Sequence, residues 1–510
     1  MQKPSKTAIR KSGMLWFIPA VLILLFFGMF FSDQNPSDAP GEPSEQTGQI
    51  EEVEHVEEGT ETALPDSDEP QDETDWMELL SADDPFGHSA KTCPLESFSP
   101  SSEDPSQTRA AFREAFAACA NGTVVVGAGT WTTGGITIPG NVTLRLERGA
   151  RVVFDPDPEH YLPAVPTRFE GMDVMNYQPL IYIPNARNVA IVGQGAFVGN
   201  GSAWWGARQN KRADGGMDEK EAAKVLYKLV QEDVPLEDRV FASMKKPLRP
   251  SFIQPYKSAN ILIRDVTFIE SPMWTVHPLY TKNLAIRGIE VDTEGRNTDG
   301  IAIDSSRNVL IEDVRISSGD DAIVIKSGLD HDGWREDTPS ENITIRDVDV
   351  LRGNGGVTIG SEMSGGVENV SVESAKFHNT DTGIRLKTLE GRGGYIRNLS
   401  FRDIVMENII EDAIKLDATY SSATFSSASD RHPDVRNILI EDIRVRGAER
   451  AIRIDGGPFG FSRVTLRSGI FDVDTAGSIN DISDLVWDDM TLRTKDGSAI
   501  EMQSIRYAFD

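Results

Sequence analysis

Five charged residues in the second half of the chain have the types and spacing that polysaccharide cleavage requires. They are Asp299, the pair Asp320-Asp321, Arg385 and Lys387. Hydrolysis of a glycosidic bond needs one carboxylic acid that protonates the leaving oxygen and one carboxylate that activates water. Neighbouring carboxylates raise one another's pKa, which supplies the acid. Because Arg and Lys bind carboxylates, the set predicts cleavage of an acidic polysaccharide.

These charged residues lie in short segments that share one apolar pattern. The six segments are DGIAID (299–304), DAIVIK (321–326), GGVTIG (355–360), TGIRLK (382–387), DAIKLD (412–417) and RAIRID (450–455). Side chains alternate between the two faces of a strand, so the paired apolar residues are expected to point inward. This register puts Asp299 and Asp321 in one column on neighbouring strands, with Arg385 and Lys387 about 10 Å from Asp321. The small residues beside the aspartates, such as Gly300 and Gly356, are expected to leave an open floor for a ligand.

A second motif repeats through the same region and sets the fold class. It is an asparagine followed by an apolar residue, any residue and another apolar residue, and it starts at Asn141, Asn188, Asn260, Asn283, Asn308, Asn342, Asn369, Asn398 and Asn437. Repeats of this length with short strands and no helical period between them indicate a solenoid. The sequence therefore predicts an all-β fold, a right-handed parallel β-helix over residues 89–510.

Two elements are expected to depart from the coils. Asp104 and Pro105 have the types preferred at a helix N-cap and first turn, so a short helix should cap the N-terminal end of the β-helix. Residues 207–250 form an insert that interrupts the repeats, with a helix expected near residues 219–231.

The N-terminal 88 residues differ in composition from the rest of the chain. Residues 1–13 are basic, residues 14–31 are uncharged and almost wholly apolar, and residues 32–88 are rich in Glu, Asp, Pro and Ser. The apolar run has the length of a short transmembrane helix and lacks a good cleavage site, which favours an anchor over a cleaved signal peptide. Residues 32–88 predict a disordered acidic linker. A membrane-anchored protein with its catalytic domain outside the cytoplasm is expected, or a secreted one if the apolar segment is cleaved.

Charge and cysteine content restrict the remaining possibilities. The net charge of −29 argues against nucleic-acid binding, because phosphate contacts require Lys and Arg. The two cysteines, Cys93 and Cys119, either form one disulfide or remain as buried thiols. We expect no cofactor, no metal ion and a monomer.

The motifs around the charged residues resemble those of glycoside hydrolase family 28, the polygalacturonases, and of its bacterial members in particular. The matching segments are Asn297-Thr298-Asp299-Gly300, Gly319-Asp320-Asp321 and Arg385-Leu386-Lys387, with further similarity in SPMWTVHPLY, IGSEMSGGVENV and GRGGYIRN. The resemblance implies an inverting hydrolase of α-1,4-galacturonosyl bonds in polygalacturonate or pectin. It also implies that Asp320 is the general acid, that Asp299 and Asp321 activate water, and that Arg385 and Lys387 bind the galacturonate carboxylate. The insert is similar to those of exo-acting members.

Three further residues are candidates for contact with the substrate. Asn297 lies in the first motif. Asn354 stands in Gly353-Asn354-Gly355, where the family usually has histidine, and asparagine cannot titrate near neutral pH. His277 is expected either to touch the substrate or to be a core histidine. Two rival functions remain open, a catalytically silent pectin-binding β-helix and a calcium-dependent pectate lyase.

Overall fold

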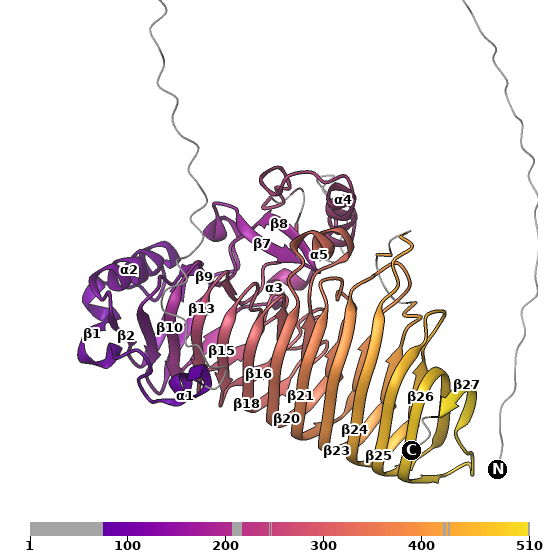
Figure 1. Cartoon of the computed structure of the whole chain (residues 1–510). Coiled ribbons are helices and arrows are strands. Elements are labelled where there is room, and N and C mark those ends of the chain that lie inside the picture. Colours follow the sequence, from indigo (N-terminus) through magenta and orange to yellow (C-terminus); the bar gives the residue numbers. More distant parts are fainter. Residues whose placement is uncertain are drawn as a thin grey trace, which may run out of the picture. The chain divides into compact units, whose positions relative to one another are not determined.

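The repeating strands wind into a parallel β-helix (Figure 1). The computed structural model describes residues 75–206, 217–243, 245, 247–421, 425–426 and 429–507. Among the described strands, only β7 (Val165–Phe169) and β8 (Met172–Asn176) pair in the antiparallel sense. The predicted all-β fold is confirmed.

The strands lengthen along the chain. The short strands are β1 (Thr92–Pro94), β2 (Gly122–Val126), β3 (Gly129–Thr133), β4 (Ile136–Thr137), β5 (Val142–Leu146), β6 (Ala150–Phe154), β9 (Ile181–Pro184), β10 (Arg187–Gly193), β11 (Ala196–Val198), β12 (Ile253–Tyr256), β13 (Ala259–Arg264), β14 (Thr267–Ile269), β15 (Lys282–Arg287), β16 (Glu290–Asp292), β17 (Ile301–Asp304) and β19 (Ile323–Lys326). The longer strands are β18 (Arg307–Ser317), β20 (Ser340–Ile359), β21 (Val367–His378), β22 (Thr380–Lys387), β23 (Tyr395–Asp417), β24 (Asp434–Asp455), β25 (Phe461–Val473), β26 (Thr475–Thr494) and β27 (Glu501–Tyr507).

Stacked apolar side chains fill the interior of the coils. The pairs aligned in the sequence are in register, since Ile301 pairs with Ile323, Ile323 with Val357 and Val357 with Ile384. All four side chains are buried in one continuous core. This register fixes which side chains face outward at the same height on neighbouring coils, and so it positions the charged residues.

The repeated asparagines form a ladder at a bend of the neighbouring coils from Asn141 to Asn437. Each has a positive φ, which asparagine tolerates better than most residues. The Nδ2 of each asparagine donates to the Oδ1 of the preceding one, at 3.0 Å from Asn188 to Asn141 and 2.8 Å from Asn437 to Asn398. These positions are therefore structural, as the repeat predicts.

The predicted capping helix is α2 (Pro105–Ala118). The Asp104 carboxylate accepts hydrogen bonds from the backbone N–H groups of Ser106 and Gln107, at 2.9 and 3.1 Å. Phe112 and Phe116 are buried in the core, so the helix closes the N-terminal end of the coils. A disulfide joins Cys93 to Cys119, which decides between the two states expected for the cysteines.

The predicted acidic linker ends earlier than expected. Residues 75–81 form helix α1 (Asp75–Ser81), whose Trp76 and Leu80 are buried against Leu262 and Leu310 on the outer face of the coils. The overall acidity of residues 32–88 concealed this short apolar segment. The basic segment 1–13, the apolar segment 14–31 and the linker as far as residue 74 lie outside the described residues. Within the described part of the chain, none of the helices has the length and apolar character needed to cross a membrane.

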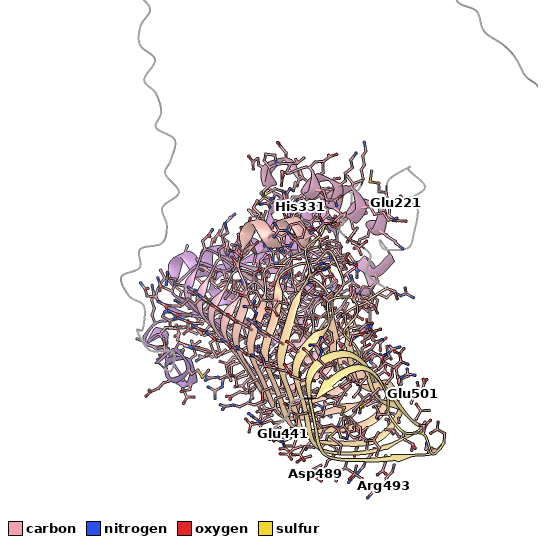
Figure 2. The ribbon with its side chains drawn as sticks, turned by 45° about the vertical axis from the view of Figure 1, so that its right-hand side comes forward. Glu221, His331, Glu441, Asp489, Arg493 and Glu501 are labelled. Atoms are coloured by element: carbon pink, nitrogen blue, oxygen red, sulfur yellow. A yellow bond between two sulfur atoms is a disulfide. The ribbon has the colours of Figure 1, made fainter. Side chains whose placement is uncertain are left out.

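A second layer covers the outer face of the coils around β17 and β19. It consists of the β7–β8 hairpin, α4 (Glu219–Gln231) and α5 (Asp330–Glu336), and it buries the outward-facing Ala302 and Val324. The helix expected in the insert is thus confirmed. Figure 2 shows Glu221 and His331 on this layer, away from Glu441 and Asp489 on the coils. The remaining helices are α3 (Ser202–Trp205), η1 (His88–Ala90), η2 (Leu95–Phe98), η3 (Pro158–Tyr161) and η5 (Leu236–Asp238).

Buried ion pairs attach this layer to the coils. Arg168, next to the turn of the β7–β8 hairpin, donates from Nη1 to Asp304 Oδ1 at 2.7 Å and from Nε to Asp173 Oδ1 at 2.8 Å. Arg249 Nε contacts Glu219 Oε2 at 2.7 Å, and the side chains of both are almost fully buried. Breaking a buried pair leaves an uncompensated charge, so these pairs hold the layer in one position.

Candidate active site

A pocket of about 230 Å³ lies where the second layer meets the outer face of the coils. Its lining contains all three predicted aspartates, together with Arg385, Lys387, Asn297 and Asn354. The other lining residues are Glu170, Trp274, Lys326, Leu329, Ser361, Glu362, Arg392, Tyr420 and Phe425. The site predicted from strand register is therefore one continuous cavity.

The backbone of two neighbouring coils positions the aspartates. Asp299 lies just before β17 and Asp321 just before β19, and Gly300 N–H donates to the Asp321 carbonyl at 3.1 Å. The neighbouring small residues do not form the pocket floor as expected. A Cβ at Gly300 would come within 2.7 Å of the Ile316 side chain, and one at Gly356 within 2.6 Å of Phe377. These glycines are small because they face the packed core.

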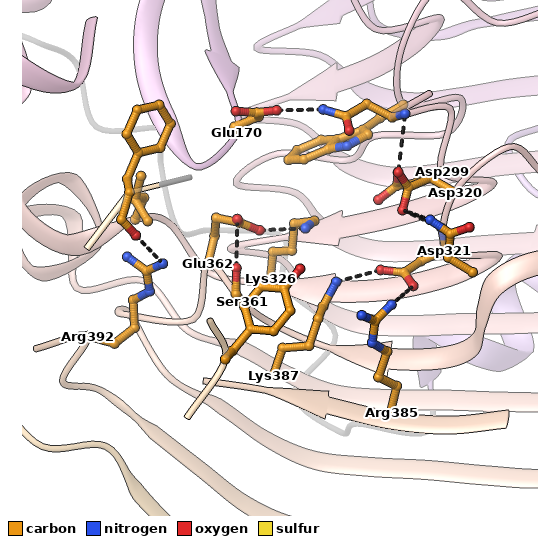
Figure 3. A pocket seen from close by; sticks show the side chains of 16 residues that line it. Glu170, Asp299, Asp320, Asp321, Lys326, Ser361, Glu362, Arg385, Lys387 and Arg392 are labelled. Atoms are coloured by element: carbon orange, nitrogen blue, oxygen red, sulfur yellow. Dashed lines mark hydrogen bonds and ion pairs between the residues drawn. The ribbon is translucent and has the colours of Figure 1, made fainter. Parts of the chain in front are cut away.

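Asp321 is held as a carboxylate by two cations. Lys387 Nζ lies 2.7 Å from Asp321 Oδ2, and Arg385 Nη1 lies 3.4 Å from Asp321 Oδ1 (Figure 3). Burial alone would raise the pKa of Asp321, but Lys387 and Arg385 outweigh it and hold the pKa well below its usual range. The long side chains span the separation of about 10 Å expected between the coils.

The pKa of Asp299 is shifted in the opposite direction from that of Asp321. Burial, and next the negative charge of Asp320, raise the pKa of Asp299 well above its usual range. Asp299 as a residue is 3% exposed, so water does little to stabilise the charge of its carboxylate. The pocket thus holds an ionised carboxylate, Asp321, and a second carboxyl group, Asp299, whose raised pKa favours the protonated form.

Three N–H groups orient the Asp320 side chain. The backbone of Asn297 donates to Oδ2 at 3.2 Å, and the backbone of Asp321 donates to Oδ1 at 3.0 Å. Asn354, at the position where the resemblance leads one to expect histidine, donates from Nδ2 to Oδ1 at 3.1 Å. Asn354 therefore contacts an aspartate of the site directly.

His277 does not reach the pocket. Its side chain is fully buried, with Nδ1 2.9 Å from both Ser251 Oγ and Gln254 Nε2, and Nε2 3.8 Å from Asp304 Oδ2. The expectation that His277 touches the substrate was wrong for this reason, and the core alternative holds. No group of three or more His, Cys, Asp or Glu side chains in the described ranges is placed to hold a metal ion.

Several charged residues of the lining were not predicted from the sequence, among them Lys326, Glu362 and Arg392. Lys326 could have been found, because it ends β19 and has the same position in its coil as Lys387 has in β22. No motif or repeat in the sequence marks Glu170 as a residue of the site. It sits in the turn of the β7–β8 hairpin, and its Oε1 accepts from Asn297 Nδ2 at 2.5 Å.

The fold and the pocket together define a class: a parallel β-helix whose outer face carries the acid, base and cationic groups that suit an acidic polysaccharide. The chain belongs to glycosyl hydrolases family 28, whose family profile matches residues 239–466. It is 32% identical to the hyperthermoactive exopolygalacturonase of Thermotoga maritima over 84% of this chain and 94% of that one, with a TM-score of 0.71.

A curated relative is also similar in sequence, and a second solved structure shares the fold. A probable polygalacturonase of Vitis vinifera is 31% identical over 341 residues, which cover 65% of this chain and 63% of the relative. The alignments with the next two curated relatives cover 34% and 38% of their lengths. A family 28 exopolygalacturonase of Yersinia enterocolitica shares the fold, with a TM-score of 0.65 at 18% identity over 82% of this chain and 78% of that one.

Proposed function

We propose that the protein hydrolyses α-1,4-galacturonosyl bonds of polygalacturonate or pectin. The observation that carries this proposal is one pocket that holds all three aspartates together with Arg385 and Lys387. The names of the Thermotoga and Vitis relatives support the galacturonate substrate. The cations Arg385 and Lys387 suit a sugar that carries a carboxylate.

The family resemblance assigns a role to each aspartate, and we propose the same roles here. Asp320 protonates the leaving oxygen, while Asp299 and Asp321 activate the attacking water, with inversion of configuration. Lys387, at 2.7 Å, keeps Asp321 ionised, so its proton affinity stays low. Arg385 makes the longer contact of 3.4 Å and is therefore the cation more readily shared with a substrate carboxylate.

The lyase alternative fits the site poorly. Calcium needs several carboxylate or carbonyl oxygens facing one point. Asp321 instead faces Lys387 and Arg385, and Glu362 faces Lys326, so ammonium and guanidinium groups occupy the positions beside these carboxylates. A catalytically silent pectin-binding β-helix would bind the same polysaccharide without cleaving it, so only a measurement of turnover separates it from a hydrolase.

We propose further that the chain acts from the end of the polymer. Tyr227 of α4 stacks on Phe425 at 4.7 Å between ring centroids, and Phe425 lines the pocket. Tyr227 OH also donates to Asp330 Oδ2 at 2.8 Å. Insert, loop and α5 thus build a wall at the pocket, and the Thermotoga relative is an exopolygalacturonase.

Early products of polygalacturonate digestion test this proposal. We expect monomer or dimer to accumulate from the start while the viscosity of the solution falls slowly, because an end-acting enzyme leaves long chains nearly intact. A broad ladder of oligomers with a rapid fall in viscosity would instead assign internal cleavage.

For location, we propose that residues 14–31 anchor the chain and that the catalytic domain lies outside the cytoplasm. The Cys93–Cys119 disulfide supports an oxidising compartment.

A further inference from the structure

Lys326 is a positively charged residue of the pocket to which the proposed reaction assigns no role. Its side chain is 5% exposed, lines the pocket and ends β19, the strand that follows Asp320 and Asp321. Strand pairing through β20 places Lys326 and Lys387 at the same position in coils two apart, a separation of about 10 Å along the helix axis. The pocket therefore has two cationic positions in succession along this axis.

The contacts of Lys326 hold its ammonium group at the pocket wall. Nζ donates to Glu362 Oε2 at 2.5 Å and lies 4.8 Å from the centre of the Trp274 ring (Figure 3). Ser361 Oγ donates to the other oxygen of Glu362 at 3.0 Å. An ammonium group has three donors, so contact with Glu362 leaves Lys326 able to bind a second anion.

Glu362 remains charged beside Lys326. Although burial opposes its charge, Lys326 and then Lys387 lower the pKa of Glu362 to about 2. The pair is thus ionised throughout the working range of pH. An apolar pair of similar volume is often as stable as a buried ion pair. The stability of the fold therefore does not account for the Lys326–Glu362 pair, and its place in the pocket points to a role in binding.

The substrate supplies the second anion. Each galacturonate carries one carboxylate, so the two sugars on either side of the cleaved bond bring two. Arg385 is the proposed partner of one, and a second carboxylate left unpaired near three aspartates would bind poorly. We propose that Lys326 binds the carboxylate of the second sugar flanking the cleaved bond, and that Glu362 positions the ammonium group before the substrate arrives. This inference rests on the proposed function, because it assumes a uronate substrate.

The test measures binding of digalacturonate to the full-length protein carrying Asp320→Asn, which slows turnover enough for binding to be measured. Titration calorimetry compares the unmodified dimer with its two mono-methyl esters, one neutral at each sugar. In this background each ester should bind more weakly. Adding Lys326→Met with Glu362→Gln removes both charges at similar volume. We expect this variant to bind the acid about tenfold to hundredfold more weakly and to lose discrimination against one ester only.

Matched variants separate recognition from folding. Arg385→Met should lose discrimination against the other ester. Lys326→Arg keeps the positive charge, so it should keep the discrimination that is lost in the neutral pair, the variant with Lys326→Met and Glu362→Gln. Lys376→Met, on the exposed outer side of β21, should change neither ratio. If the neutral pair folds with an unchanged melting temperature and still discriminates against both esters, the inference is overturned. If the variant with Lys326→Met and Glu362→Gln unfolds, the test rests on Lys326→Arg. A Lys326→Arg protein that folds but no longer discriminates against that ester overturns the inference. Hydrolysis by the wild type is measured separately, so failure of the proposed function remains distinguishable.

Discussion

Replacing Asp320 with Asn is expected to reduce turnover of polygalacturonate by about 10²–10⁴-fold while leaving substrate affinity nearly unchanged. Asparagine keeps the shape of the side chain, and its Oδ1 can still accept from the Asp321 N–H and from Asn354 Nδ2, while the hydrogen bond from the Asn297 N–H is lost. What is lost is the proton for the leaving oxygen. Initial rates and binding of the variant are compared with those of Asp313→Asn, an exposed residue of β18 with a positive φ that Asn tolerates.

A galacturonide with a nitrophenyl leaving group sharpens the assignment. Such a leaving group departs without protonation, so Asp320→Asn should recover most of its activity on this substrate. Asp299→Asn should not recover, because activation of water is still needed. The raised pKa of Asp299 is the reason to test the converse assignment. Recovery of Asp299→Asn instead of Asp320→Asn would transfer the role of proton donor to Asp299.

Replacing Lys387 with Met is expected to move the acid limb of the pH profile to higher pH by at least about one unit. In the wild type, Lys387 and Arg385 hold the pKa of Asp321 below its usual range, so the carboxylate stays ionised as the pH falls. Without Lys387, the raising effect of burial is less opposed and the pKa rises. Below the new pKa the ionised fraction, and with it the rate, falls about tenfold per pH unit.

The pH profile of kcat measures this shift, since it reports groups in the bound complex. Activity of Lys387→Met should return as the pH approaches neutrality, where Asp321 is ionised again. Lys376→Met should keep the wild-type profile. A Lys387→Met profile that is unchanged in shape, with KM alone raised, would mean that Lys387 serves the substrate and not Asp321.

The periodic part of this protein could be predicted from its sequence because one physical rule governs it. Alternation of side chains gave the register of Ile301, Ile323 and Val357, and this register brought Asp299 and Asp321 together. The asparagine ladder followed from the same repetition. Each of these features depends on neighbouring coils that carry similar segments.

The second layer could not be predicted in this way. Arg168 and Asp304 form a buried ion pair although they are far apart in the sequence, and Arg168 belongs to no repeated pattern. Glu170 reaches the pocket only because this pair and Asp173 hold the hairpin. His277 was left open between the substrate and the core, and the structure places it in the core, where Ser251 and Gln254 contact its Nδ1. Lys326 does follow the repeat, because it has the same position in its coil as Lys387, and it could have been predicted from that position.

The most direct test of the central claim is the chemistry of the products released from polygalacturonate. We predict that the protein releases reducing ends without forming an unsaturated, ultraviolet-absorbing sugar, that EDTA does not abolish this activity, and that Asp320→Asn releases reducing ends at least about a hundredfold more slowly. Unsaturated products that depend on calcium would contradict the account and assign a lyase. Binding of polygalacturonate with no release of reducing ends from any pectic polymer would contradict it as well and leave a polysaccharide-binding β-helix.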